Sequence, residues 1–383
     1  MKALILSIST GQGHHATAEA IQNVFESKGV KCRTIDAYEY IEPRLSKLVS
    51  KGYTIGTSQI PKISSKIYNL AVKKNKPSKK VSVTNATTTV MAWDLKKFIQ
   101  LYDPQVIICT HVLSSMLVST MKTKEWTDAQ TVGIVTDFTV HPLWQDAAGL
   151  DYFVLPNELL EFQMSKKGID TSKLLPLGIP IKPEFSQRGD RKEAREKLGL
   201  DLELPTILLM SGSMGFGRID KSIAMLDKMD LDFQTMVVCG NNKDMYNKIK
   251  NKKLQKRFDV YGYVNHIDTM MDASDCVITK PGGITSSEAL AKGLPMIMNN
   301  PIPGHEMRNA EFMLNNGIAL YVTKSFPLDE AVFSLFKHPG RLDDLRATID
   351  LYGHRHSTEK LCEFLLQRTA TREQTESFQR TDI

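Results

Sequence analysis

The chain lacks the features that mark a disulfide-stabilised or membrane-spanning protein. Its five cysteines are scattered through 383 residues without a C-x-x-C pair, which is typical of a reducing compartment. No apolar run reaches the roughly 18 to 20 residues that cross a bilayer. The opening stretch, "MKALILSIS", is too short for a signal peptide and has no cleavage site. These absences predict a soluble, cytoplasmic protein.

Acidic residues are absent from one long stretch. Between Arg44 and Lys80 the sequence has ten Lys or Arg residues and no Asp or Glu. The net charge is +6, but without these ten residues 39 basic side chains would stand against 43 acidic ones. The positive charge is therefore local, and it predicts an anionic partner, either a nucleic acid or a membrane surface. Nucleic acid is the weaker interpretation, because Tyr53 and Tyr68 are the only aromatic residues of the stretch.

Short apolar runs alternate with amphipathic stretches along the whole chain. The first half has "ALILSIS", "PQVIICT", "TVGIVTD" and "YFVLP", and the second has "TILLMSG", "TMVVCG", "DCVITK" and "LPMIMN". Such strands predict an α/β protein with two doubly wound parallel sheets, each covered by helices on both faces. Three prolines near residue 181 indicate a linker. We expect domains at residues 1–181 and 182–353, a helix at 354–369 and a disordered tail at 370–383.

A glycine-bearing turn, "GQGHHATAEAI", follows the first predicted strand. Ligands of doubly wound sheets bind outside the carboxyl ends of the strands. Glycines such as Gly13 let the backbone turn sharply there and let a ligand approach closely. His14 would lie near the N-terminus of the next helix, whose dipole favours a neutral imidazole that can act as a base. The alternative is an ordinary tight turn in which His14 and His15 are incidental.

The segment "KPGGITSSEALAKGLPMIMNNPIPGHEMRNAEF" carries two more polar turns after strands. Thr285 and its neighbouring serines should begin a helix, whose free N–H groups can bind phosphate. Glu288, expected within the first turn, can accept hydrogen bonds from ribose hydroxyls. His305, Glu306 and Asn309 should face the same crevice. Phosphate, ribose and polyhydroxyl recognition in series indicates a nucleotide sugar, although ordinary capped turns remain the alternative.

A third glycine-rich turn, "SGSMGFG", follows the strand "TILLM". It is not a P-loop, because the G-x-x-x-x-G-K-[ST] pattern is missing. By itself it is a weak signal, and its value lies in its agreement with the other two turns.

Together these motifs resemble the monogalactosyldiacylglycerol synthase and processive diacylglycerol glucosyltransferase family. More distantly they resemble the N-acetylglucosaminyltransferase that completes the lipid-linked peptidoglycan precursor. The resemblance covers nearly the whole chain, from "GQGHHATAEAI" through "VTDFTVHPLW", "SGSMGFG" and "DVYGYV" to "KPGGITSSEAL" and "IPGHEMRNAEF". It implies a GT-B fold, in which two doubly wound domains face each other across a cleft and a C-terminal helix crosses back to the first domain. It also implies an inverting transfer of hexose from a UDP-sugar to a membrane lipid, with diacylglycerol as the expected acceptor.

The resemblance further implies roles for individual residues. His14 matches the general base, with Asp137 as a second catalytic candidate, and His141 lies with Asp137 in the acceptor-side motif. Glu288 matches the ribose-binding glutamate. The remaining residues that we expect to bind the donor, from the turns and from the resemblance together, are Gly13, Ser213, Met214, Gly215, Tyr263, Val264, Gly283, Ile284, Thr285, His305, Glu306 and Asn309. Five lysines of the basic stretch are expected at the membrane: Lys73, Lys74, Lys76, Lys79 and Lys80.

The same comparison bears on cofactors, location and competing functions. Helix N-termini and the turn Ser213–Gly215 can stabilise the departing diphosphate without a metal, so we expect no obligatory metal and no cofactor besides the UDP-sugar co-substrate. "SKIYNLAVKK" mixes apolar and cationic residues as an interfacial helix does, which predicts a peripheral protein on the inner face of the cell membrane. A solvated basic loop is the alternative there. A UDP-sugar 2-epimerase and a non-catalytic UDP-sugar-sensing regulator remain the alternative functions.

Overall fold

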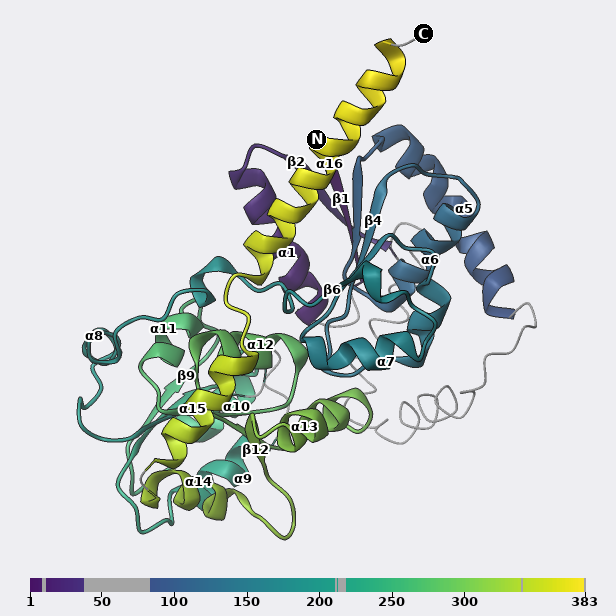
Figure 1. Cartoon of the computed structure of the whole chain (residues 1–383). Coiled ribbons are helices and arrows are strands. Elements are labelled where there is room, and N and C mark those ends of the chain that lie inside the picture. The colour runs from purple at the N-terminus through teal and green to yellow at the C-terminus, as the bar shows by residue number, and fades with distance from the viewer. Residues whose placement is uncertain (9–11, 38–82, 211, 213–217, 339, 382–383) are drawn as a thin grey trace. The chain divides into compact units, whose positions relative to one another are not determined.

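The computed structural model describes residues 1–8, 12–37, 83–210, 212, 218–338 and 340–381. The chain divides into two compact units, each built on its own sheet (Figure 1). Unit 1 comprises Met1–Pro183 and His356–Ile383, and unit 2 comprises Glu184–Arg355. None of the helices in the described ranges combines the length and the apolar content needed to span a membrane.

Unit 1 contains a six-stranded sheet in the order β2-β1-β3-β4-β5-β6, with every neighbouring pair parallel. Its strands are β1 (Lys2–Ser7), β2 (Lys31–Asp36), β3 (Val106–Cys109), β4 (Gln130–Ile134), β5 (Tyr152–Val154) and β6 (Leu174–Leu175). Its α-helices are α1 (Gln12–Ser27), α5 (Val83–Tyr102), α6 (Val112–Thr123), α7 (Glu161–Ser165) and α16 (Ser357–Thr381). Short 3₁₀ helices are η1 (Pro142–Ala147), η2 (Glu158–Leu160), η3 (Thr171–Lys173) and η4 (Pro183–Phe185), the last of which crosses the boundary between the units.

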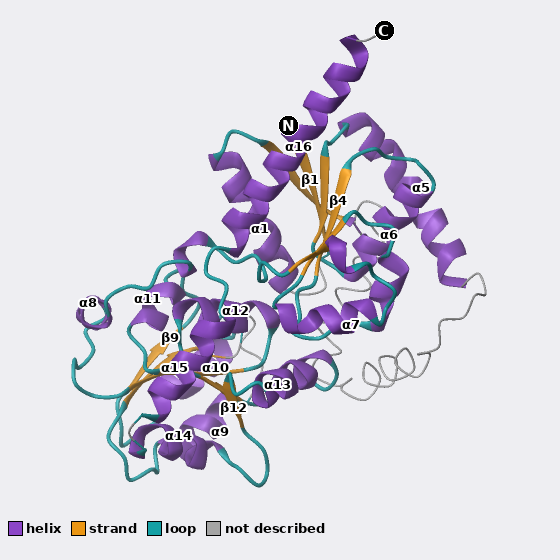
Figure 2. Ribbon diagram, viewed as in Figure 1, coloured by secondary structure: helices purple, strands orange, loops and turns teal. Residues whose placement is uncertain are grey.

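The helices of unit 1 cover both faces of the sheet. Helices α1 and α16 lie together on one side, and α5 and α6 lie on the other (Figure 2). Apolar strand residues such as Ile5 and Ile108 pack with Phe25 of α1 and Leu361 and Leu365 of α16, all fully buried. The C-terminal helix is therefore part of the core of unit 1.

The start of α16 is bonded to the segment that we expected to be a linker. Ser357 Oγ donates to the backbone oxygen of Ile179 at 2.8 Å, and Thr17 Oγ1 of α1 donates to that of Pro180 at 3.2 Å. Ile179 and Ile181 are each 1% exposed, so this segment is packed within unit 1. We expected a helix at residues 354–369 and a disordered tail after it, whereas α16 continues to Thr381.

Unit 2 repeats the architecture with a parallel sheet in the order β12-β11-β10-β7-β8-β9. Its strands are β7 (Thr206–Met210), β8 (Gln234–Val238), β9 (Phe258–Tyr261), β10 (Cys276–Thr279), β11 (Met296–Met298) and β12 (Ala319–Tyr321). Its helices are α8 (Arg191–Lys197), α9 (Ile219–Leu226), α10 (Lys243–Lys250), α11 (Ile267–Asp272), α12 (Gly283–Lys292), α13 (His305–Asn315), α14 (Leu328–Lys337) and α15 (Arg341–Tyr352).

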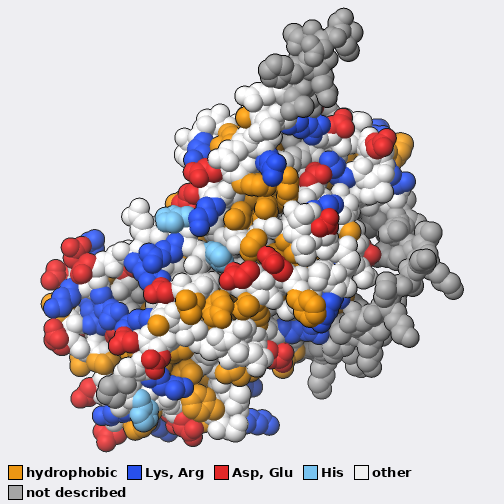
Figure 3. Space-filling model, in the orientation of Figure 1, with side chains coloured by type: hydrophobic (Ala, Val, Ile, Leu, Met, Phe, Trp, Pro, Cys, Tyr) orange, Lys and Arg blue, Asp and Glu red, His pale blue; other side chains and the backbone are white. Residues whose placement is uncertain are grey.

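A buried carboxylate connects β7 and β10, the two central strands of the sheet in unit 2. Asp275, just before β10, accepts from the backbone N–H of Thr206 in β7 and from Arg195, both at 2.8 Å. Arg191 pairs with the other oxygen of Asp275 at 2.8 Å. Most charged side chains of unit 2 are instead on the surface, where both signs are interspersed (Figure 3).

All eight strands predicted from apolar runs are confirmed, as β1, β3, β4, β5, β7, β8, β10 and β11. The short strands β6, β9 and β12 and the polar strand β2 were not predicted. β2 and β9 form sheet edges and are only partly buried, so they need no apolar run.

Candidate active site

Each sheet has one position where the order of its strands reverses, and several of the predicted site residues follow the strands on either side of it. In unit 1 this position lies between β1 and β3, which pair in register up to Leu6 and Cys109. The connections after these strands lead to α1 and α6, which lie on opposite faces of the sheet. In doubly wound sheets, ligands bind at the carboxyl edge between two such helices.

His14 occupies this edge in unit 1. Its Nδ1 lies 2.8 Å from the backbone oxygen of Thr110, just after β3, and 3.3 Å from Thr136 Oγ1, just after β4. A carbonyl oxygen can only accept, so Nδ1 carries a proton. In the neutral ring Nε2 is then the basic nitrogen. The backbone oxygen just after β3 therefore selects the tautomer of His14 that is protonated at Nδ1.

His111 is a site residue that the sequence reasoning missed. Its ring packs edge-on against that of His14, with 4.6 Å between the centroids. His111 Nδ1 accepts from the backbone N–H of Leu113 at 3.1 Å and caps the N-terminus of α6. The signal was present in the sequence, because "ICTH" places a polar residue directly after an apolar strand.

The other polar residues of this edge have different contacts. His15, next to His14 on α1, places its Nδ1 3.2 Å from Ser7 Oγ at the end of β1. Asp137 is half-buried in the loop after β4. His141 Nδ1 accepts from the backbone N–H of Leu143 at 3.2 Å and caps η1, so this side chain supports the loop.

In unit 2 the strand order reverses between β7 and β10. The turn "SGSMGFG" follows β7, but Ser213, Met214 and Gly215 lie outside the described residues. The turn after β10 leads into α12, whose N-cap is Gly282. Gly282 has no side chain to cap the helix, so the first N–H groups of α12 are directed out of its end. A Cβ at Gly282 would meet nothing within 4 Å, which leaves room for a ligand against this backbone.

Helix α12 presents the predicted residues on one face. Ile284, Thr285 and Glu288 are half-exposed, whereas Ser286 and Ser287 between them are buried. Spacings of three and four residues bring Glu288 onto the same face as Thr285 and Ile284. One expectation was wrong: Glu288 is the sixth residue of α12, in its second turn, since the helix begins at Gly283.

The residues predicted to bind the hexose connect α13 to the turn after β10. Glu306 is 7% exposed, and its carboxylate accepts from the backbone N–H of Ile302 at 2.6 Å and lies 3.6 Å from Lys280 Nζ. Asn309 is fully buried and donates to the backbone oxygen of Pro281 at 3.0 Å. His305, half-buried, begins α13. These contacts hold the two loops of the candidate donor site in one arrangement.

The sharp entry into α13 depends on Gly304. Its φ of 117° and ψ of −114° lie in a region that is open essentially only to glycine. This conformation allows the chain to leave β11 and begin the helix with His305.

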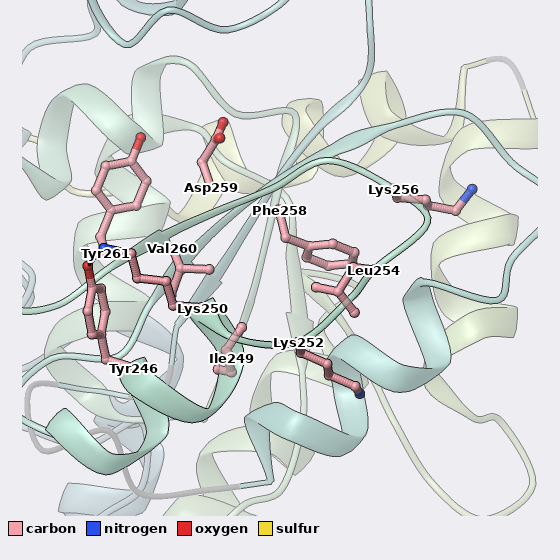
Figure 4. Close-up of a pocket in the computed structure, with 10 residues that line it drawn as sticks. All are labelled: Tyr246, Ile249, Lys250, Lys252, Leu254, Lys256, Phe258, Asp259, Val260 and Tyr261. Carbon is pink, nitrogen blue, oxygen red and sulfur yellow. Dashed lines mark hydrogen bonds between the residues drawn. The ribbon is translucent and has the colours of Figure 1, made fainter.

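The residues expected to contact the base of the nucleotide follow the edge strand β9. Tyr263 is 62% exposed, and Val264 is half-buried. A cavity of about 560 Å³ lies along β9 and α10 and is lined mainly by lysine, tyrosine and apolar side chains (Figure 4). Its lining comes from residues 246–256 and from β9 itself, and it does not include the predicted donor-binding residues at the strand ends.

Two further expectations concern metal and membrane. Within the described residues, no three His, Cys, Asp or Glu side chains are grouped so that they could hold a metal ion. The five lysines expected at the membrane, Lys73, Lys74, Lys76, Lys79 and Lys80, lie outside the described residues.

Comparison with known proteins gives matches over nearly the whole chain. The family model described as monogalactosyldiacylglycerol (MGDG) synthase matches residues 14–181, and that described as glycosyl transferases group 1 matches residues 190–349. A processive diacylglycerol beta-glucosyltransferase of Bacillus pumilus is 26% identical over 371 residues, 96% of this chain and 95% of the relative. The uncharacterized glycosyltransferase YkoN of Bacillus subtilis is 30% identical over 80% of each chain.

Solved structures show the same fold. The crystal structure of Acinetobacter baumannii MurG superposes with a TM-score of 0.62 and covers 96% of this chain and 99% of its own. At 11% identity, this likeness concerns the fold alone.

Proposed function

The chain belongs to the family of monogalactosyldiacylglycerol synthases and processive diacylglycerol glucosyltransferases, which are glycosyltransferases of the GT-B fold, and we propose that it transfers a hexose from a UDP-sugar to diacylglycerol or a related membrane lipid. The observation that carries this proposal is the hydrogen bond between His14 Nδ1 and the backbone oxygen of Thr110. It holds the imidazole at this edge of the sheet with Nδ1 protonated, which would make Nε2 the nitrogen that acts on the acceptor hydroxyl.

The donor is assigned to unit 2. The first N–H groups of α12 at Gly283, Ile284 and Thr285 would bind the diphosphate, which the helix dipole favours. Glu288, on the same face one turn later, would accept from the two ribose hydroxyls. Residues 262–264 after β9 would contact the uracil base of the UDP-sugar.

The hexose is assigned to the start of α13. His305 and Glu306 follow β11, next to the turn that would hold the diphosphate. Glu306 is fixed by Ile302 and Lys280, so it would meet the sugar with a carboxylate that cannot rotate away. Gly13 in unit 1 and Ser213, Met214 and Gly215 complete the donor contacts in this proposal.

The acceptor and the base are assigned to unit 1. The acceptor hydroxyl would lose its proton to His14 Nε2 as its oxygen forms a bond to the anomeric carbon on the face opposite the diphosphate. The bond from that carbon to the diphosphate oxygen breaks, and UDP leaves with the electron pair. A single displacement of this kind inverts the anomeric configuration, and helix N-termini would stabilise the leaving diphosphate without a metal. Asp137 is the second candidate for the base, and His141 supports the acceptor loop.

A lipid acceptor requires the enzyme to reach a bilayer. We assign the protein to the inner face of the cell membrane, as a peripheral protein that the basic stretch at residues 44–80 attracts to anionic lipid. Each Lys or Arg near an anionic leaflet contributes about 1 kcal/mol.

The proposal is tested with a donor panel. Purified protein is incubated with UDP-glucose or UDP-galactose and diacylglycerol in detergent micelles, and the products are identified by mass. A hexosyl-diacylglycerol is the expected product. An epimerised donor would instead indicate a UDP-sugar 2-epimerase. An unchanged donor that nevertheless binds would indicate a sensor, and either of these two results contradicts the proposal.

A further inference from the structure

The cavity along β9 and α10 follows the free edge of the sheet in unit 2. β9 is the last strand in the order of that sheet, and among the described strands it pairs with β8 alone. All four residues of β9 are half-buried and line the cavity: Phe258, Asp259, Val260 and Tyr261. Successive side chains of a strand point to opposite faces of the sheet, so one hollow can touch all four residues only along the edge of the strand.

The pairing with β8 shows which backbone groups of β9 face this hollow. Backbone N–H groups of β8 and of the residue after it donate to the oxygens of Arg257 and Tyr261, at 3.1 and 2.9 Å. The N–H and C=O of one residue in a parallel strand point to the same side, and those of the next residue point to the other. Arg257, Asp259 and Tyr261 therefore face β8, whereas Phe258 and Val260 turn their backbone groups toward the cavity. No hydrogen bond within the described ranges reaches these groups from the cavity side.

The lining of the cavity is cationic. It includes three lysines, Lys250, Lys252 and Lys256, and one carboxylate, Asp259. Asp259 is paired with Arg257 at 2.9 Å, whereas none of the three lysines forms an ion pair with a carboxylate in the part of the chain that the structure describes. The surrounding stretch, residues 248–257, has six Lys or Arg residues and no Asp or Glu. The cavity therefore favours an anionic partner.

The lysines are distributed along the strand. Lys250 Nζ donates to the hydroxyl oxygen of Tyr246 at 3.1 Å and lies beside Tyr261 at one end of the cavity (Figure 4). Lys256 lies at the other end, and Phe258 lies between the two lysines (Figure 4). A ligand along β9 would meet a cation near each of its ends and an apolar or aromatic surface between them.

An extended acidic peptide matches these features. A free strand edge binds an extended segment through main-chain hydrogen bonds, and side-chain contacts select the sequence. Lysine at a sheet edge normally prevents strand pairing, and it would place like charges opposite each other if two copies of this chain paired through β9. Carboxylate side chains turn the same lysines into favourable partners. The charge of the edge therefore excludes most strands and admits acidic ones.

We propose that the free edge of β9 binds an extended acidic peptide segment of another protein, which adds to the sheet and pairs its carboxylates with Lys250, Lys252 and Lys256. The inference goes beyond the proposed function, because the residues assigned to the donor and the acceptor take no part in it. We call this surface the β9 edge.

Binding is measured with synthetic peptides and the full-length protein. Calorimetry uses a peptide of about eight residues in which glutamate and valine alternate and both ends are blocked. The first control peptide has lysine in place of glutamate. The second has proline in place of every second valine, which keeps the charge but prevents strand pairing. We expect the glutamate–valine peptide to bind and both control peptides to fail.

A matched pair of triple variants measures the contribution of the lysines. Lys250→Gln/Lys252→Gln/Lys256→Gln should weaken binding of the glutamate–valine peptide about tenfold, because three exposed ion pairs of modest strength are lost. The control changes three exposed lysines of unit 2 outside the lining, and it should bind as the unaltered protein does: Lys192→Gln/Lys324→Gln/Lys337→Gln. The control removes the same net charge, so a difference between the variants reports on the β9 edge.

Amide exchange distinguishes strand addition from attraction between charges alone. In the free protein the N–H groups of Phe258 and Val260 should exchange faster than those of Asp259 and Tyr261, which face β8. With about nine-tenths of the protein bound to peptide, exchange at Phe258 and Val260 should slow about tenfold, because it then proceeds from the free fraction. NMR of the isotope-labelled protein measures each amide separately.

Several results would overturn the inference. Peptide binding without slower exchange at Phe258 and Val260 would mean that only charge attracts the peptide. Equal affinities of the two triple variants, or no binding of the glutamate–valine peptide, would also overturn it. Displacement of the peptide by UDP would assign the peptide to the donor site, and displacement by inorganic phosphate would make the cavity a site for small anions. Peptide binding without glycolipid formation in the donor panel would contradict the proposed function and leave the β9 edge standing.

Discussion

Replacing His14 by alanine tests the assignment of the general base most directly. The ring is held at Nδ1 by the backbone oxygen of Thr110 and by Thr136 Oγ1, and Nε2 is the nitrogen that would take the proton. Loss of a general base costs about 10²- to 10⁴-fold in turnover, which corresponds to roughly 3 to 5 kcal/mol in the activation barrier. UDP affinity should hardly change, because the residues assigned to the donor, apart from Gly13, lie in unit 2.

The contacts of His14 and its neighbours predict graded effects. Thr136→Val removes one hydrogen bond to Nδ1 but leaves the bond to the Thr110 backbone, which selects the tautomer. A single neutral hydrogen bond contributes about 1 kcal/mol, so the expected loss is about fivefold. His15→Ala should be milder than His14→Ala, because His15 faces Ser7 and is not held by Thr110.

The assay is the initial rate of transfer to a short-chain diacylglycerol, with UDP affinity measured by calorimetry. If His15→Ala abolishes transfer while His14→Ala does not, the base has been misassigned by one residue. If both variants are nearly as active as the unaltered enzyme, the base lies elsewhere, and Asp137 is the next candidate. A large fall in UDP affinity for His14→Ala would also refute the reasoning, since it would place His14 at the donor.

Three further predictions concern the donor site and the thiols. Glu288→Ala should weaken UDP binding by at least about tenfold, since two charge-assisted hydrogen bonds are lost. The control is Glu330→Ala, which changes an exposed glutamate on α14. Unchanged UDP affinity of Glu288→Ala in calorimetry would contradict the ribose role. Glu306→Gln keeps an oxygen for the N–H of Ile302 but removes the charge, so turnover with UDP-hexose should fall while UDP itself binds almost normally; equal losses for both ligands would assign Glu306 to the fold instead. Burial raises the pKa of the Cys239 thiol to about 11 and that of the Cys32 thiol to about 12, so both thiols are protonated at neutral pH. The native protein should therefore react only slowly with a disulfide reagent, whereas the unfolded protein should show five reactive thiols. Rapid reaction of either thiol in the native protein would contradict this prediction.

Much of the architecture follows from short stretches of sequence. Each central strand is a largely apolar run of three to six residues that is buried on both faces, and this composition is visible without knowledge of its neighbours. The same reasoning placed polar residues at the strand ends, among them His14, Glu288 and His305. It failed for β2, because the residues Lys31–Asp36 are mostly polar and only partly buried at a sheet edge.

The contacts within the site depended on the order of the strands. Thr110 and Thr136 lie 96 and 122 residues from His14 and contact it only because β1, β3 and β4 are consecutive in the sheet. Likewise, Glu306 meets Lys280 because β10 and β11 are neighbours. The sequence by itself determined which residues end strands and which side chains are chemically able to act, because burial and turn formation are local properties. Only the tertiary structure decided which of them meet and which ring nitrogen of His14 carries the proton, because those depend on backbone atoms that the chain brings together from distant positions.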